Sequence, residues 1–168
     1  MRILNKIIIA LMFISAGAFI YARPGTDDKI KVLDKQGVEQ LINNRNGKVL
    51  FLNLWATWCV PCREEIPDIE KLHKEYKDKI DVAGLSIDYP DEIQSKILPF
   101  VKSQKLTYEI YVNGIKSDEE LINMLNKDWN GALPVTLIYD PKGNREIFLE
   151  GKKSYSEFKK AVETVLKQ

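Results

Sequence analysis

The sequence is poor in the residues on which metal sites and disulfide frameworks are built. Its 168 residues include only two cysteines, Cys59 and Cys62, and a single histidine, His73. Two cysteines cannot form the several bridges that hold a small disulfide-rich domain together. They also supply only half of the ligands of a tetrahedral zinc site, and His73 lies too far along the same predicted helix to complete it. The sequence therefore favours neither a disulfide scaffold nor a metal centre.

An excess of charge of either sign is also missing. The chain carries 25 basic and 24 acidic residues, which gives a net charge of +1. This balance provides no electrostatic reason to expect nucleic acid or an anionic membrane surface as a partner. With 45% hydrophobic residues and no internal repeat, the composition excludes a disordered chain, a fibre and a coiled coil. The remaining possibility is one ordinary globular domain.

Acidic residues are absent from the start of the chain, and the first of them is Asp27. Arg2 and Lys6 precede an apolar run over residues 7–20, which only Ser15 interrupts. A charged start followed by an apolar run is typical of a secretory signal. The run is shorter than the roughly 20 apolar residues that a membrane-spanning helix requires.

An uncleaved membrane anchor remains the alternative, because Tyr21 and Ala22 extend the apolar run. We therefore expect residues 1–22 to be a signal peptide or an anchor and residues 23–168 to form the domain. Basic residues favour the cytoplasmic side of a membrane, so this domain is expected in the periplasm or on the outer face of the cytoplasmic membrane. Contact with the membrane is expected only through residues 1–22.

Strand and helix patterns alternate along the rest of the chain. Apolar runs predict strands at 29–33, 49–55, 80–87, 108–112, 135–139 and 146–149, and helical spacing predicts helices around 38–42, 61–77, 93–101, 121–125 and 158–166. The run 49–55 is almost continuously apolar, as in a central strand covered on both faces. The sequence DPKGN at 140–144 predicts a hairpin turn. Alternating strands and helices with a late hairpin predict an α/β layer fold with a mixed sheet.

The two cysteines stand in the sequence WCVPC at 58–62, between a predicted buried strand and a predicted helix. Their spacing places both sulfurs on one face of the first helical turn, within reach of a disulfide. The free N–H groups and partial positive charge of a helix N-terminus stabilise a thiolate at Cys59. Cys59 is therefore the predicted nucleophile, and Cys62, one turn deeper, is predicted to resolve the mixed disulfide. A purely structural bridge is disfavoured, because so short a loop constrains the unfolded chain little.

The stretch 49–67, VLFLNLWATWCVPCREEIP, resembles the active-site strand and helix of the thioredoxin superfamily. In detail it is similar to the extracytoplasmic TlpA/ResA-like thiol-disulfide oxidoreductases, and the resemblance covers most of the chain from about Lys29 onward. It implies a thioredoxin-like fold, in which helices flank a central mixed β-sheet. It also implies an extra helix and strand between Asp88 and Pro134, before the strand that follows the cis-proline.

The segment 131–136, GALPVT, resembles the cis-proline loop of this family. The resemblance implies that Pro134 faces the two sulfurs and that the backbone of Leu133 binds an extended strand of the substrate. Trp58, next to Cys59, is expected to shield one side of the site and to favour apolar substrate segments. Pro134, Leu133 and Trp58 are therefore the predicted substrate-binding residues.

A proton acceptor for Cys62 is the remaining requirement. Thioredoxins have a buried acid six residues before the first cysteine, but this chain has Asn53 there, which cannot exchange protons. Glu65 lies three residues after Cys62 on the same side of the helix and matches a glutamate of ResA-like proteins. A half-buried carboxylate at this position would have a raised pKa and could carry the Cys62 proton. The neighbouring Glu64 is expected to be an ordinary solvated carboxylate.

These observations predict an enzyme, a thiol-disulfide oxidoreductase that reduces disulfides in extracytoplasmic proteins through Cys59 and Cys62. The resemblance implies substrates such as the haem-binding cysteines of apocytochromes c, a membrane thiol-electron carrier that re-reduces the pair, and no bound cofactor or metal. A disulfide oxidase or isomerase would use the same residues, so both remain alternatives. A copper-binding module is the non-enzymatic alternative. A thiol peroxidase is disfavoured, because the P-x-x-x-T-x-x-C arrangement of peroxiredoxins is absent.

Overall fold

The computed structural model describes residues 30–44 and 47–168, so the predicted signal or anchor at residues 1–22 lies outside the described residues. The elements are β1 (Lys31–Leu33), α1 (Lys35–Asn43), β2 (Val49–Trp55), α2 (Val60–Tyr76), β3 (Ile80–Ser86), the short turns η1 (Pro90–Glu92) and η2 (Ile93–Ile97), α3 (Leu98–Gln104), β4 (Glu109–Asn113), α4 (Asp118–Leu125), β5 (Val135–Tyr139), β6 (Arg145–Glu150) and α5 (Tyr155–Leu166). Within these ranges no helix is long and apolar enough to cross a membrane.

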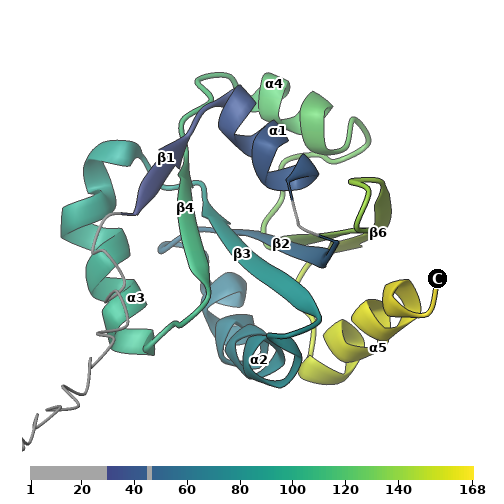
Figure 1. Cartoon of the computed structure of the whole chain (residues 1–168). Helices are drawn as coiled ribbons and strands as arrows, with labels where there is room; N and C mark the ends of the chain where they lie inside the picture. Colours follow the sequence, from purple (N-terminus) through teal and green to yellow (C-terminus); the bar gives the residue numbers. More distant parts are fainter. Residues whose placement is uncertain (1–29, 45–46) are drawn as a thin grey trace, which may run out of the picture.

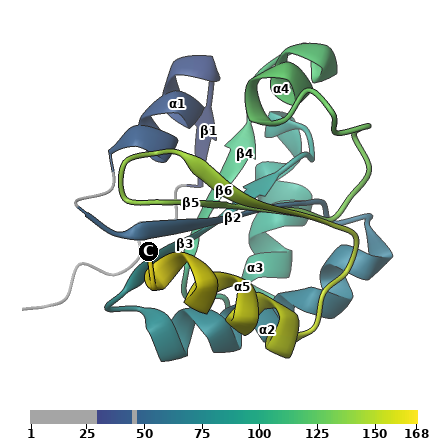
Figure 2. The same ribbon diagram turned by 90° about the vertical axis from the view of Figure 1, so that its right-hand side faces the viewer.

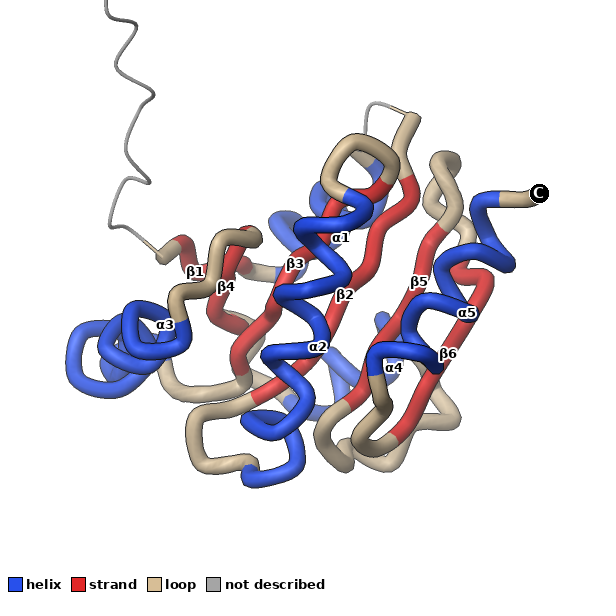
Figure 3. Tube along the Cα trace, turned by 90° about the horizontal axis from the view of Figure 1, so that it is seen from below, coloured by secondary structure: helices blue, strands red, loops and turns tan. Residues whose placement is uncertain are grey.

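The six strands form one mixed sheet in the order β1-β4-β3-β2-β5-β6, which Figure 3 shows strand by strand. β1, β4, β3 and β2 run parallel to one another, whereas β5 and β6 are antiparallel to their neighbours. The predicted α/β fold with a late hairpin is confirmed. The extra helix and strand are α3 and β4, and β4 lies between β1 and β3 in the sheet.

Helices cover both faces of the sheet (Figures 1 and 2). α2, α3 and α5 pack on one face and α1 and α4 on the other, so the apolar side chains fall into two buried clusters. β2 belongs to both clusters, because Phe51 and Trp55 point to the first and Leu50, Leu52 and Leu54 to the second. All of its residues are buried, as the continuous apolar run predicted for a central strand.

One predicted helix differs in its detail. The apolar spacing over residues 93–101 predicted a single helix, but the chain forms a π-helical turn at Ile93–Ile97 before α3 begins. Pro99 in the first turn of α3 explains the break, because proline has no N–H with which to continue the hydrogen bonding of the preceding turn. The N–H of Leu98 instead reaches back to the carbonyl of Ile93.

The register of β2 places the active-site loop. Trp55 at its end is paired with Ser86 at the end of β3, and Leu54 is paired with Val135 at the start of β5. The segments that leave β2 and β3 and the segment that enters β5 therefore meet at one edge of the sheet. Loops at the carboxyl edge of parallel strands are where α/β proteins place their functional residues.

Candidate active site

Cys59 and Cys62 form a disulfide at the start of α2, with their Cα atoms 5.3 Å apart. Cys59 is the N-cap residue of the helix, and its Sγ accepts a hydrogen bond from the backbone N–H of Cys62 at 3.3 Å. Cys59 is 5% exposed and Cys62 is completely buried. Cys59 is therefore the sulfur nearer to solvent, and in the reduced protein the helix N-terminus stabilises negative charge at its Sγ.

The loop between β2 and Cys59 is held by a residue that sequence reasoning missed. The buried carboxylate of Asp88, just after β3, accepts hydrogen bonds from the backbone N–H of Thr57 at 2.8 Å and from its hydroxyl at 2.6 Å. The Ser86 hydroxyl donates to the same carboxylate at 2.6 Å. The available signal was an acidic residue directly after an apolar strand, but nothing in the sequence identifies Thr57 as its partner.

Replacing Asp88 with alanine should destabilise the protein by about 2–3 kcal/mol, because the donors of Thr57 and Ser86 would lose their acceptor. Urea unfolding of the oxidised protein measures this loss. Asp91→Ala, at an exposed position three residues further on, is the control and should change stability by less than about 0.5 kcal/mol. Equal stability of the two variants would show that the Asp88 carboxylate does not hold the loop.

Glu65 is more deeply buried than the sequence suggested. We expected a half-buried carboxylate, but the side chain is 1% exposed. The reason is tertiary, because Asn53 of β2 and the loop after β6 enclose it. Asn53 Nδ2 donates to Oε1 at 2.9 Å, and the backbone N–H of Lys153 donates to Oε2 at 3.0 Å. Burial raises the pKa of Glu65 to about 7, although both of these hydrogen bonds act to lower it.

Glu64 is exposed, as expected, and pairs with Lys152 at 2.7 Å. Asn53, which seemed to mark only the absence of an acid, instead contacts the acid that is present. Its Nδ2 also donates to the hydroxyl of Thr136 on β5 at 3.1 Å. The sheet register pairs Asn53 directly with Thr136, so β2 and β5 together position the Glu65 carboxylate.

The peptide bond between Leu133 and Pro134 is cis, as the resemblance implied. Pro134 precedes Val135, which pairs with Leu54 in the sheet, so the cis-proline loop lies beside the end of β2. β2 ends at Trp55, four residues before Cys59. The Pro134 carbonyl accepts from the N–H of Gly151 at 2.8 Å. Trp129 is buried, and its indole N–H donates to the Ala132 carbonyl at 2.8 Å. The indole thus supports the loop from inside.

Large apolar side chains are exposed around Cys59. Trp58 is 64% exposed, Val60 60% and Tyr89 74%. Trp58 and Val60 are the two neighbours of Cys59 in the chain, and Tyr89 follows Asp88, whose carboxylate binds Thr57. Two of the five large apolar side chains that are exposed in the described ranges therefore flank Cys59, and Tyr89 follows the residue that binds the loop before it. Exposed apolar patches of this kind mark sites of protein contact.

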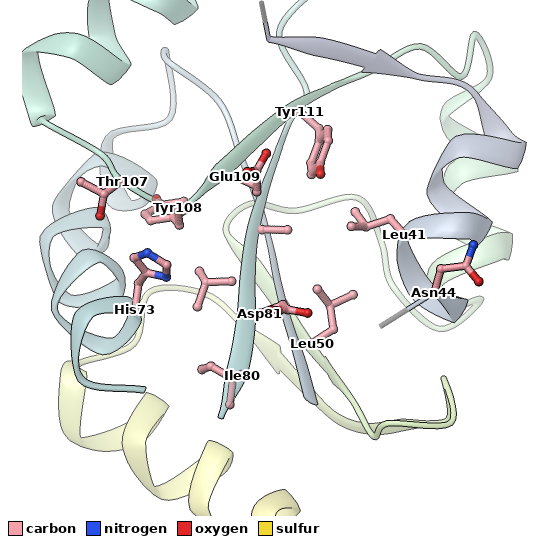
Figure 4. A pocket seen from close by; sticks show the side chains of 12 residues that line it. Leu41, Asn44, Leu50, His73, Ile80, Asp81, Thr107, Tyr108, Glu109 and Tyr111 are labelled. Atoms are coloured by element: carbon pink, nitrogen blue, oxygen red, sulfur yellow. The ribbon is translucent and has the colours of Figure 1, made fainter. Parts of the chain in front are cut away.

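A pocket of about 360 Å³ lies at the other end of the sheet, between the first residues of β3 and β4 (Figure 4). His73 lines this pocket, and its ring contacts the Tyr108 ring at a centroid distance of 6.0 Å. Burial lowers the pKa of His73. The pocket lies away from the disulfide, because Ile80 at the start of β3 lines the pocket, whereas Ser86 at the end of β3 pairs with Trp55 near the disulfide.

In the described part of the chain no group of three or more His, Cys, Asp or Glu residues is placed to hold a metal ion.

Comparison with known proteins places this arrangement in a family. The profile of the AhpC/TSA family matches residues 27–144. The chain belongs to the AhpC/TSA family. It is 34% identical over 119 residues to the thioredoxin-like protein YneN of Bacillus subtilis, a match that spans 70% of this chain and 64% of YneN. It is also 25% identical over 174 residues to the thiol-disulfide oxidoreductase ResA of Geobacillus thermodenitrificans. This match spans 97% of this chain and 95% of that protein.

Solved structures of thioredoxin-related proteins agree with the fold. A thioredoxin-related protein from Neisseria meningitidis superposes with a TM-score of 0.62 at 29% identity, covering 73% of this chain and 88% of that one. A thiol:disulfide interchange protein from Chlorobium tepidum gives a TM-score of 0.60 at 27% identity, covering 71% and 81%. The predicted thioredoxin-like fold is confirmed by these structures and by the six-stranded sheet.

Proposed function

We propose that this thiol-disulfide oxidoreductase reduces disulfides in protein substrates outside the cytoplasm. The proposal rests on the way the start of α2 combines two features. A disulfide at the N-terminus of α2 presents Cys59 toward solvent, and a buried glutamate whose pKa is near 7 lies one helical turn beyond Cys62. The first feature suits attack on a substrate, and the second suits removal of the Cys62 proton.

The reaction begins with the reduced pair. The Cys59 thiolate attacks one sulfur of the substrate disulfide, which breaks the S–S bond and releases the other sulfur as a thiolate. Cys62 then gives its proton to Glu65 and attacks the Cys59 sulfur. The new Cys59–Cys62 disulfide forms, the second substrate sulfur leaves, and two electrons have passed from the enzyme to the substrate. The oxidised pair described above is the product of this half-reaction.

The substrate is proposed to lie between the cis-proline loop and the exposed apolar side chains. The backbone of Leu133 would bind an extended segment beside Pro134, while Trp58 contacts its apolar side chains. The exposure of Trp58 supports this contact, because a ring open to solvent is available to a bound chain. A protein segment with apolar residues next to its cysteines fits this surface.

The location and the partners complete the proposal. Residues 1–22 would direct or anchor the domain outside the cytoplasm, as the basic start and the apolar run at 7–20 suggest. In an oxidising compartment a reductase must itself be re-reduced, which requires a dithiol donor supplied through the membrane. Apocytochromes c are the proposed substrates, on the basis of the resemblance to TlpA/ResA-like proteins.

The reduction potential of the Cys59–Cys62 pair tests the direction of the reaction. Equilibration in dithiol buffers, followed by the fluorescence of Trp58, should give a value near or below about −270 mV, the potential of thioredoxin. A value near about −120 mV, that of a strong oxidant, would contradict a reductase and indicate a disulfide-forming enzyme. A Trp58→Phe variant assigns the signal, because it retains the two other tryptophans of the chain, Trp55 and Trp129.

A further inference from the structure

Asn53, Glu65 and Thr136 form a small polar cluster beneath the helix that carries the cysteines. They belong to β2, α2 and β5, and all three side chains are buried. Asn53 Nδ2 donates both to Glu65 Oε1 at 2.9 Å and to Thr136 Oγ1 at 3.1 Å. Asn53 Oδ1 is buried and has no hydrogen-bond partner among the described residues. The amide therefore bonds through one of its two ends only.

These hydrogen bonds fit the ionised form of Glu65. Both carboxylate oxygens accept, Oε1 from Asn53 and Oε2 from the backbone N–H of Lys153 at 3.0 Å. When Glu65 takes up a proton, its O–H needs an acceptor. A backbone N–H and an amide NH₂ are both donors, so neither oxygen of Glu65 faces an acceptor in this arrangement. A buried donor that faces another donor is destabilising.

We propose that the side-chain amide of Asn53 turns over by half a rotation each time Glu65 gains or loses a proton. In the turned form Oδ1 accepts from the Glu65 O–H and from the Thr136 hydroxyl, which can donate as well as accept. Two hydrogen bonds are made in each form, and one end of the amide lacks a partner in each. Asn53 is thus a positioning residue that satisfies both protonation states of Glu65. This inference rests on the proposed role of Glu65 as the acceptor of the Cys62 proton.

The charges around Glu65 allow both states near neutral pH. Lys153, in the loop after β6, favours the carboxylate, and Asp68, one turn further along α2, disfavours it. Tyr108, just before β4, is buried and stays neutral, because burial raises its pKa further above the ordinary value and the nearby Glu65 adds to this. Cys62 on the same helix is the proton donor. Burial has the largest effect and raises the pKa of Glu65 to about 7, so the amide would turn near neutral pH.

Nuclear magnetic resonance of the oxidised protein, labelled with ¹⁵N and ¹³C, tests this proposal directly. In this form the disulfide removes the cysteines from the titration. The side-chain carboxyl ¹³C of Glu65 is followed from pH 5 to pH 9, together with nuclear Overhauser contacts between the Asn53 NH₂ protons and the Thr136 methyl group. We expect these contacts at pH 9 and their loss at pH 5. The pH at which half of the contact intensity is lost should equal the midpoint of the Glu65 carboxyl titration. Contacts report position, so a change of charge alone would not remove them.

Two controls make the measurement specific. Asn113 is the matched amide, because its Nδ2 donates to the Ile115 carbonyl at 3.2 Å and its Oδ1 accepts from the Ile115 N–H at 3.1 Å. With both ends bonded, Asn113 should keep its contacts at every pH. In a Glu65→Gln variant the carboxyl is gone, and the Asn53 contacts should no longer depend on pH.

The outcomes separate this proposal from the one on which it rests. If the Glu65 carboxyl titrates while the Asn53–Thr136 contacts persist at both ends of the pH range, the amide is fixed and the switch is overturned. Glu65 would then still be the proton acceptor. If the Glu65 carboxyl does not titrate between pH 5 and pH 9, its proposed role as acceptor fails, and the switch fails with it.

Discussion

Replacing Cys62 with serine is expected to trap the enzyme on its substrate as a stable mixed disulfide. Cys59, at the N-cap of α2, keeps the N–H groups that stabilise its thiolate and still attacks. Serine at position 62 cannot displace the substrate sulfur, so turnover should fall to the rate of the uncatalysed exchange. Intact-mass analysis after incubation of the reduced variant with a disulfide-containing peptide should show the added mass of one peptide half.

Cys59→Ser is the matched control for this experiment. It should form no adduct, because Cys62 is completely buried behind Cys59. Turnover should be lost in both variants, and only Cys62→Ser should accumulate the adduct. An adduct on Cys59→Ser alone would reverse the two roles, and turnover by both variants would show that the cysteine pair is not the reacting group.

Glu65→Gln is expected to slow the resolution of the mixed disulfide by about 10²–10⁴-fold, the usual contribution of a general base. In the unmodified enzyme this step should speed up as pH rises and level off above about pH 7, because the pKa of Glu65 is about 7 and only its carboxylate accepts the proton. The variant should lose this midpoint. Stopped-flow fluorescence in a single turnover measures the step. Glu64→Gln is the control, since Glu64 is exposed and pairs with Lys152 in a surface ion pair.

The Glu65→Gln variant should also change how the free energy of unfolding depends on pH. The pKa of Glu65 is about 7 in the folded protein, above its ordinary value of 4.5. Stability from this group is therefore fully present below pH 4.5 and is lost as pH rises through 7, by about 3 kcal/mol in total. Glu65→Gln should abolish this loss, so that urea unfolding of the oxidised variant changes less between pH 5 and pH 8. An unchanged pH dependence would show that Glu65 is not the buried acid responsible.

The chemistry of the site was accessible from the chain because its determinants are local. The spacing of Cys59 and Cys62, the proline between them and the apolar run before them all act within one strand and one helical turn. For the same reason Glu65 could be placed on the Cys62 side of the helix. Its degree of burial could not, because the groups that enclose it come from positions 53 and 153.

The sequence alone determined the alternation of strands and helices, the central strand 49–55 and the cysteine pair at a helix N-terminus. These follow from periodicity, capping and spacing, which are properties of neighbouring residues. Only the tertiary structure decided that Asp88 holds Thr57 and that Asn53 bonds both Glu65 and Thr136. Such contacts join residues 12 to 83 positions apart, and which polar groups meet in the interior depends on how the sheet brings separate strands together.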